Sequence, residues 1–143
     1  MPATPSEIIE ANRNLGRRFF QEQDQLHGGP ADNFCAPVYT ARLAGYPAMD
    51  LSGHKQFAAA WYSAFPDTHH TIEDVMADSN GATVRFTIRG THKGAFNGVG
   101  PTGKSITVGG IAMMRVQAGK VVDLWAQFDQ AGMLQQLGLR PGQ

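Results

Sequence analysis

The spacing of apolar residues changes after Asp67, from a helical period to a strand period. Before that point, apolar side chains recur every three or four residues in two stretches, which is typical of amphipathic helices. The first stretch has its apolar face on Ile8, Ala11, Leu15 and Phe19, and the second on Phe57, Trp61 and Phe65. The elements predicted in this half are a helix over 6–23, a short helix over 31–36, a strand over 38–43, a loop over 44–51 and a helix over 52–65, capped by Ser52.

After Asp67 the residues alternate between apolar and polar types, which predicts antiparallel strands. One strand covers 68–77, and Asn80-Gly81 is a strong signal for a hairpin turn. In the next strand Val84, Phe86 and Ile88 alternate with polar residues. Helices followed by antiparallel strands predict the α+β class, with the helices packed on one face of the sheet.

A second, longer hairpin over 104–128 is expected to lie at the centre of this sheet, with the apolar face of the first helix against its concave side. Its first strand, 105–116, is apolar in both alternating sets, so we expect both faces of the strand to be covered. Asp129 then caps a short helix over 130–137, which Gly138 closes.

Length, charge and cysteine content restrict the class of protein. A chain of 143 residues is long enough for one domain with a small internal cavity. Twelve basic and twelve acidic residues give a net charge of zero without charge runs, which favours a small, mostly uncharged ligand over nucleic acid or a membrane surface. Cys35 is the single cysteine, so no internal disulfide is possible. The start of the chain lacks the apolar core of a secretory signal, and we expect a cytoplasmic protein.

Residues 98–105, GVGPTGKS, match the phosphate-binding pattern G-x-x-x-x-G-K-[ST] and also G-x-G-x-x-G. Either motif needs a helix directly after the glycines, because the amides at the helix start hold the phosphates. Ile106-Thr107-Val108 predicts a strand instead, so we interpret the segment as a glycine-rich connection and expect no nucleotide cofactor.

The five histidines are candidates for acid–base chemistry or metal binding. His69 and His70 are adjacent and therefore point to opposite sides of a strand, and no cysteine or carboxylate stands beside them at a ligand spacing. The sequence thus predicts no metal site. His92 stands near the end of a strand, where its ring either takes part in chemistry or simply bonds to the backbone.

Segments spread over nearly the whole chain resemble, in order, the SnoaL-like polyketide cyclases of the nuclear-transport-factor-two-like superfamily. They are RRFF at 17–20, FCAPVY at 34–39, AFPD at 64–67, GTHKG at 90–94, PTGK at 101–104, and a C-terminal set comprising RV at 115–116, GKVV at 119–122, Trp125, Phe128-Asp129 and GMLQQLG at 132–138. The resemblance implies a cone-shaped α+β barrel, in which a curved antiparallel sheet and the N-terminal helices enclose an apolar pocket. It also implies a single domain, a homodimer or higher homo-oligomer, and chemistry without metal or organic cofactor.

The chain departs from these cyclases at the positions that carry their chemistry. The resemblance places a catalytic carboxylate three residues before Asp129, where this sequence has Ala126. The family's histidine on the neighbouring strand falls at Ala112, and another position that is often histidine is Leu124. Aldol ring closure needs a base for the carbon acid and an acid for the alkoxide, and methyl groups supply neither.

The predicted function is therefore cyclase-related acid–base chemistry on a small cyclic or polyketide-like compound, of a cyclase, isomerase or hydrolase type. His92 and Asp129 are the candidate catalytic residues, although an N-cap carboxylate is a poor proton donor, and Arg42 could bind a carboxylate, polarise a carbonyl or face solvent. The alternatives are a non-catalytic binding or accessory protein, or epoxide opening or hydroxylation in the same pocket. Residues expected to contact an apolar or aromatic ligand are Phe20, Tyr39, Arg42, Trp61, Tyr62, Ala112, Met114, Leu124, Ala126 and Phe128.

Overall fold

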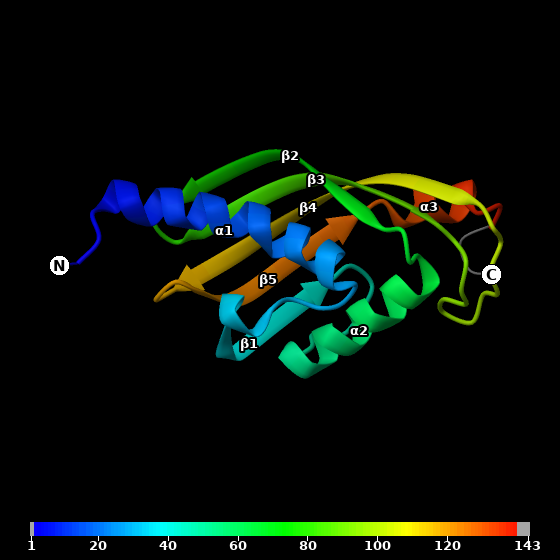
Figure 1. Cartoon of the computed structure of the whole chain (residues 1–143), viewed down its shortest axis with the longest axis horizontal. Helices are drawn as coiled ribbons and strands as arrows, with labels where there is room; N and C mark the ends of the chain where they lie inside the picture. Colours follow the sequence, from blue (N-terminus) through cyan, green and yellow to red (C-terminus); the bar gives the residue numbers. More distant parts are fainter. Residues whose placement is uncertain (1, 140–143) are drawn as a thin grey trace.

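A computed structural model describes residues 2–139, which form three α-helices, a short 3-10 helix and one five-stranded sheet (Figure 1). In chain order the elements are α1 (Pro5–Leu26), η1 (Asp32–Phe34), β1 (Cys35–Leu43), α2 (Leu51–Ala64), β2 (His69–Asp78), β3 (Gly81–Thr91), β4 (Ser105–Gln117), β5 (Lys120–Phe128) and α3 (Gln130–Gln136). This arrangement is the predicted α+β class, with α1 and α2 in front of the sheet in Figure 1.

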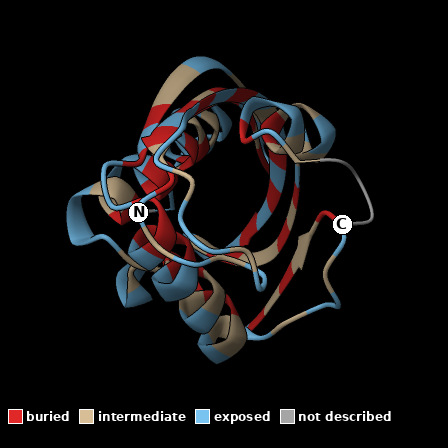
Figure 2. Ribbon diagram, turned by 90° about the vertical axis from the view of Figure 1, so that its right-hand side faces the viewer, coloured by how far each residue is buried: buried red, intermediate tan, exposed pale blue. Residues whose placement is uncertain are grey.

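The strands follow the order β1-β5-β4-β3-β2, so the long hairpin of β4 and β5 lies in the interior of the sheet as predicted. Neighbouring strands from β2 to β5 are antiparallel, but β1 pairs with β5 in parallel. The expectation of a wholly antiparallel sheet is therefore wrong for β1, because Cys35 pairs with Val121 and both strands start at the same end. The sheet bends into an open arc and does not close into a complete barrel (Figure 2).

Helix α1 is longer than predicted and buries a different face. It begins after Thr4, whose hydroxyl accepts the Glu7 amide in a capping box, and it continues to Leu26. The predicted anchor Ile8 is 38% exposed, because the first turns of α1 extend beyond the strands (Figure 1). Its buried residues are Asn12, Gly16, Phe19, Phe20 and Gln23, and they pack the helix mainly on β2 and β3. The expected packing of this helix against the β4–β5 hairpin is therefore wrong.

The region between α1 and α2 also differs from the prediction. The expected helix over 31–36 is the single 3-10 turn Asp32–Phe34, and β1 already begins at Cys35. Pro37 is tolerated because β1 is an edge strand whose pairing with β5 is irregular between Cys35 and Thr40. Asp50, rather than Ser52, caps α2 by accepting the Gly53 amide at 2.8 Å.

Strand β4 is covered on one face within a single chain. Ile111 and Met113 on its other face are 51% and 45% exposed, so the prediction of two covered faces holds for one face only. Figure 2 shows this alternation of buried and exposed residues along the strands. Its buried set, Ile106, Val108, Ala112, Met114 and Val116, belongs to the main core.

Two further expectations concern the ends of β4 and β5. Strand β4 starts at Ser105, directly after the glycine-rich loop, so the phosphate-like pattern lacks the helix that would hold phosphates. Helix α3 follows β5, and its Gln136 side chain bonds both backbone groups of Thr107, which covers the β4 edge beyond the end of β5. No helix within residues 2–139 is long and apolar enough to cross a membrane.

Candidate functional site

A small cavity of about 70 Å³ lies between the inner face of the sheet and helices α1 and α2. Its wall is mainly aromatic and aliphatic, and it also contains the side chains of Gln23, His54, Tyr62 and His70. Two of these are histidines: His54 of α2 bonds to Tyr39, and His70 of β2 bonds to Asp24. The apolar part of the wall comprises Phe20, Leu43, Phe57, Ala58, Trp61, Phe86, Ile88, Leu124, Ala126 and Phe128.

A glycine on β4 makes room for one wall of this cavity. Gly110 pairs with Phe86, and a β-carbon at Gly110 would lie 2.5 Å from Cε1 of that ring. The Phe86 ring can therefore lie over Gly110, where it packs against Phe20 at 5.0 Å and against His70 at 5.4 Å between ring centroids. The same region of the sheet thus positions both the apolar wall and a histidine.

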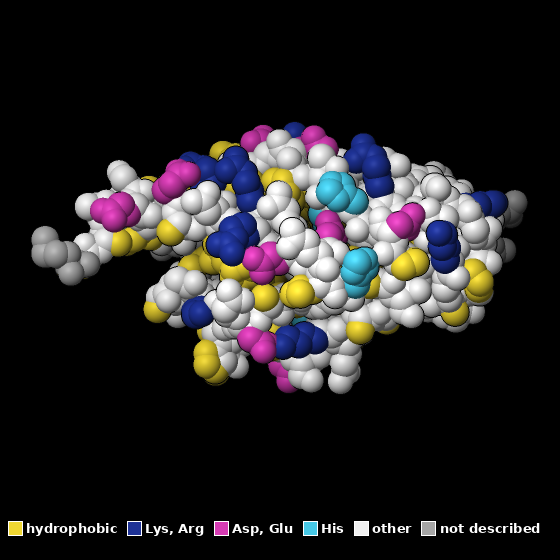
Figure 3. All heavy atoms as spheres, viewed as in Figure 1, with side chains coloured by type: hydrophobic (Ala, Val, Ile, Leu, Met, Phe, Trp, Pro, Cys, Tyr) yellow, Lys and Arg dark blue, Asp and Glu magenta, His cyan; other side chains and the backbone are white. Residues whose placement is uncertain are grey.

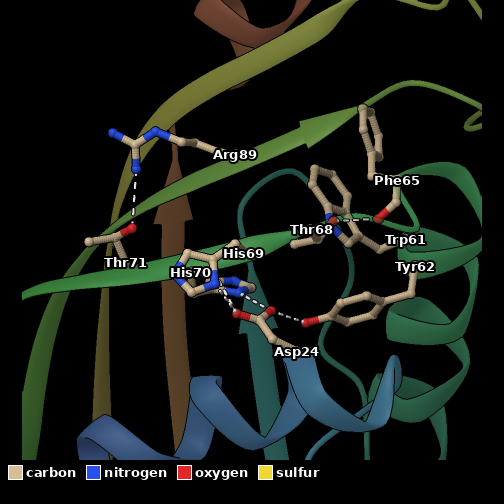
Figure 4. Close-up of polar contacts among 9 residues, drawn as sticks. All are labelled: Asp24, Trp61, Tyr62, Phe65, Thr68, His69, His70, Thr71 and Arg89. Atoms are coloured by element: carbon tan, nitrogen blue, oxygen red, sulfur yellow. Dashed lines mark hydrogen bonds and ion pairs between the residues drawn. The ribbon is translucent and has the colours of Figure 1, made fainter.

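Asp24, near the end of α1, holds His70 of β2 and Tyr62 of α2 (Figure 4). Its Oδ1 accepts hydrogen bonds from His70 Nδ1 at 2.7 Å and from the Tyr62 hydroxyl at 2.6 Å. Its Oδ2 accepts the backbone amide of His70 at 2.6 Å. Three elements therefore converge on one carboxylate.

These bonds fix the charge of Asp24 and the tautomer of His70. Burial raises the pKa of Asp24, but the hydrogen bonds from His70 and Tyr62, with the favourable charge interaction with His70, outweigh it and lower the pKa below its usual value. Burial, followed by the bond to the Asp24 carboxylate, raises the pKa of Tyr62, so this hydroxyl stays protonated. An ionised carboxylate accepts only, so His70 carries a proton on Nδ1 and its neutral form has a lone pair on Nε2.

The neighbouring His69 differs in its surroundings, as the strand alternation predicted. Its side chain is 69% exposed, whereas that of His70 is 10% exposed. His69 Nδ1 lies 4.0 Å from Asp24 Oδ2, beyond hydrogen-bonding distance. The sequence shows no carboxylate at a ligand spacing beside this pair, and the carboxylate that His70 bonds comes instead from α1, 46 residues away in the chain.

The second cavity histidine, His54 of α2, is bonded to Tyr39 of β1. The Tyr39 hydroxyl and His54 Nδ1 are 2.8 Å apart, and the two rings are nearly parallel. Burial raises the pKa of Tyr39, and burial lowers the pKa of His54 to about 4. Both groups are therefore neutral near pH 7.

Six of the ten predicted ligand-contact residues lie in the cavity wall. They are Phe20, Trp61, Tyr62, Leu124, Ala126 and Phe128. Ala112 and Met114 are buried on the inner face of the sheet but are not part of the wall, and Tyr39 lies behind His54. Arg42 is on another surface, where its guanidinium pairs with Asp123 at 3.0 Å and lies 4.7 Å above the Trp125 ring centre.

The two predicted catalytic residues also lie outside the cavity wall. His92 is 1% exposed, stacks on Phe65 and accepts the Thr102 amide at Nδ1, which ties the glycine-rich loop to the end of β3. Its Nε2 has no hydrogen-bond partner among the described residues. Asp129 caps α3 by accepting the Gly132 amide at 2.9 Å.

A wider hollow of about 520 Å³ lies at the turn end of β2, β3 and β4. It is open to solvent, and its lining includes Asp78, whose carboxylate accepts the amides of the Asn80-Gly81 turn. Because the smaller cavity holds the histidines, we place the candidate site there. Within residues 2–139, no three histidine, cysteine or acidic side chains gather as a metal site.

The structure thus combines a curved sheet and two helices around a small apolar cavity that has two imidazoles in its wall. The family model of the SnoaL-like polyketide cyclases matches residues 16–137, and the chain belongs to this family. Comparison with curated proteins finds no match.

Solved structures with the same fold include relatives from several bacteria. A SnoaL-like protein from Jannaschia sp. CCS1, a candidate polyketide cyclase, is 18% identical, with a TM-score of 0.82 and 99% of each chain covered. IdmH of Streptomyces antibioticus, also a candidate polyketide cyclase, is 27% identical, with a TM-score of 0.70 and coverage of 96% of this chain and 100% of IdmH. AclR of Streptomyces galilaeus, a candidate hydroxylase, is 21% identical, with a TM-score of 0.77 and coverage of 91% and 97%.

Proposed function

We propose that this chain is an enzyme that carries out cofactor-independent acid–base chemistry on a small cyclic or polyketide-like compound, with His70 as the general base. The observation that carries the proposal is the bond from His70 Nδ1 to the ionised Asp24, on the wall of an apolar cavity. A carboxylate that fixes the tautomer of a histidine also stabilises the imidazolium formed when the ring accepts a proton. Asp24 and Tyr62 are then positioning residues, because they act through His70.

The apolar surroundings support this assignment. Ala126 and Leu124, at positions where the resemblance expects acid–base groups, form part of the same wall and provide only hydrocarbon. The base therefore comes from β2 rather than from β5. Acidic and basic side chains are interspersed over the face shown in Figure 3, in keeping with an uncharged ligand rather than a polyanion.

The size of the cavity restricts how a ligand binds. An apolar cavity of about 150 Å³ can enclose a benzene ring, whereas the cavity here is about 70 Å³. A ring can enter only if part of the wall moves. Phe57 and Phe128 are the aromatic wall residues that remain partly exposed, so we expect them to move first.

The test is deuterium incorporation, followed by proton NMR, at the acidic C–H positions of small cyclic ketones and β-keto esters in D2O. Native protein is expected to accelerate exchange, His70→Gln to abolish it, and Asp24→Asn to reduce it by about 100-fold or more, in line with general-base contributions. The exposed neighbour provides the matched control, since His69→Gln is expected to exchange at the native rate. Native protein that binds these compounds without exchange would instead favour the non-catalytic binding protein.

We also propose that the protein is a homodimer formed through the uncovered face of β4 and β5. Ile111 and Met113 are exposed on this face, and the neighbouring Trp125 ring lies beneath the guanidinium groups of Arg42 and Arg115. A second copy would bury the two aliphatic side chains and complete the coverage that the apolar pattern of β4 indicates.

A further inference from the structure

His54 and Tyr39 form a second hydrogen-bonded pair at the cavity, and the proposed general-base chemistry does not use this pair. His54 is in the cavity wall, whereas Tyr39 is behind it and 3% exposed. The bond between them occupies Nδ1 of His54. This bond leaves Nε2 as the ring nitrogen that is available to a molecule in the cavity.

The tautomer of His54 follows from the hydrogen-bond acceptor that the buried Tyr39 hydroxyl requires. A buried hydroxyl without an acceptor is costly, and His54 Nδ1 is the acceptor that the structure provides for this hydroxyl. If Nδ1 carried the ring proton, the Tyr39 hydroxyl hydrogen would have no partner among the described residues. Tyr39 therefore donates to Nδ1, and the proton of the neutral ring is on Nε2.

The Nε2 atoms of the two cavity histidines thus have opposite hydrogen-bonding roles, one as an acceptor and the other as a donor. His70 presents a lone pair at Nε2 because Asp24 accepts from its Nδ1. His54 presents an N–H at Nε2 because Tyr39 donates to its Nδ1. Since burial lowers the pKa of His54 to about 4, its ring remains a neutral donor rather than a cation near pH 7.

We propose that His54 is the electrophilic partner of His70, and that the substrate is a carbonyl compound with an acidic hydrogen on the carbon next to the carbonyl. This inference rests on the proposed function. His70 Nε2 forms a bond to the hydrogen as the C–H bond breaks, and the C–H electron pair becomes the C=C bond of an enolate. The carbonyl π pair moves to oxygen, and that oxyanion accepts a hydrogen bond from His54 Nε2–H. Return of the proton, or attack of the enolate carbon on a second carbonyl, completes the reaction.

A neutral donor suits this role. In an apolar site, a fixed N–H stabilises charge that develops on oxygen in the transition state, and removing one such donor typically slows a reaction by about 100- to 1,000-fold. His54→Phe is therefore expected to lower kcat for deuterium exchange by that factor, with a few-fold change in KM. His54→Gln retains an N–H donor and is expected to keep most of the rate. Tyr39→Phe removes the hydrogen bond that fixes the tautomer of His54. Its exchange rate is expected to lie between those of His54→Phe and His54→Gln.

A spectroscopic measurement separates this inference from the identity of the base. The probes are 13C-carbonyl cyclopentanone and cyclohexanone, and the readout is the infrared carbonyl stretch of the bound ketone. The stretch is expected to fall in native protein, His70→Gln and His54→Gln, and to return toward its value in hydrocarbon in His54→Phe. Circular dichroism and thermal unfolding establish that each variant is folded.

An unchanged carbonyl stretch in folded His54→Phe, or the absence of ketone binding to native protein, would overturn the inference. Native protein that shifts the carbonyl through His54 but exchanges no hydrogen would refute His70 as the base and support His54 as the carbonyl donor. Exchange that depends on His70 but is unaffected by His54→Phe would keep the proposed function and refute the role of His54.

Discussion

Acid is expected to destabilise this protein through His54 over a defined pH range. The unfolded chain binds a proton at this residue below its ordinary pKa of 6.5, whereas the folded ring does so below about pH 4. Between these values the unfolded state holds more protons, so the free energy of unfolding falls as the pH falls. Above pH 6.5 the ring is neutral in both states, and below about pH 4 the loss is complete.

The size of the effect follows from the same two values. Each pH unit in this range changes the free energy of unfolding by about 1.4 kcal/mol, so the interval from 6.5 to about 4 corresponds to about 3 kcal/mol. His54 is only 4% exposed, so solvent screens this effect little. Against the total stability of a typical domain, about 5–15 kcal/mol, this is a large fraction.

The assay is urea unfolding of native protein and of His54→Gln at intervals from pH 7.5 to pH 4. The native free energy of unfolding is expected to fall by about 3 kcal/mol more than that of the variant over this range. The lowered pKa of Asp24 affects stability in a separate pH range. The stabilisation that it provides is lost only below the ordinary aspartate pKa of 3.8. Equal pH dependence of the two proteins would show that His54 is not buried as a neutral ring.

Three other substitutions test separate features of the fold. Gly110→Ala places a β-carbon 2.5 Å from Phe86 and is expected to cost about 1–3 kcal/mol in urea unfolding, whereas Gly109→Ala meets nothing within 4 Å and serves as its control; equal costs would contradict the close approach. Asp129→Ala removes the cap of α3 and is expected to cost about 1 kcal/mol, and an unchanged midpoint of unfolding would argue against that cap. Ile111→Asp is expected to convert a native dimer into a monomer in sedimentation velocity at micromolar concentration, and a monomeric native protein would refute the interface.

The local pattern of the sequence predicted the order and type of most elements. Asn80-Gly81 and the alternating residues around it specify the β2–β3 hairpin, and Asp129 specifies the start of α3. These features depend on residues that are near neighbours in the chain. The parallel pairing of β1 with β5 depends instead on contacts between distant segments, such as Cys35 with Val121, which periodicity does not encode.

The candidate site was harder to predict for the same reason. Asp24 lies just beyond the predicted end of the first helix at residue 23, and its role is evident only when the longer α1 lies across β2 and brings the carboxylate to His70. The alternation along β2 did distinguish the exposed His69 from the buried His70. The sequence analysis placed the two histidines on opposite faces of the strand but did not select His70, and its candidates His92 and Asp129 both lie outside the cavity wall.

The central claim is that the cavity wall holds one imidazole as a base and another as a donor. Two-bond proton–nitrogen NMR of protein labelled with 15N-histidine, at a pH where both rings are neutral, reports which nitrogen of each ring carries the proton. The account predicts a proton on Nδ1 of His70 and on Nε2 of His54, with the His70 signals altered by Asp24→Asn and the His54 signals altered by Tyr39→Phe. A proton on Nε2 of His70 in the native protein would contradict it.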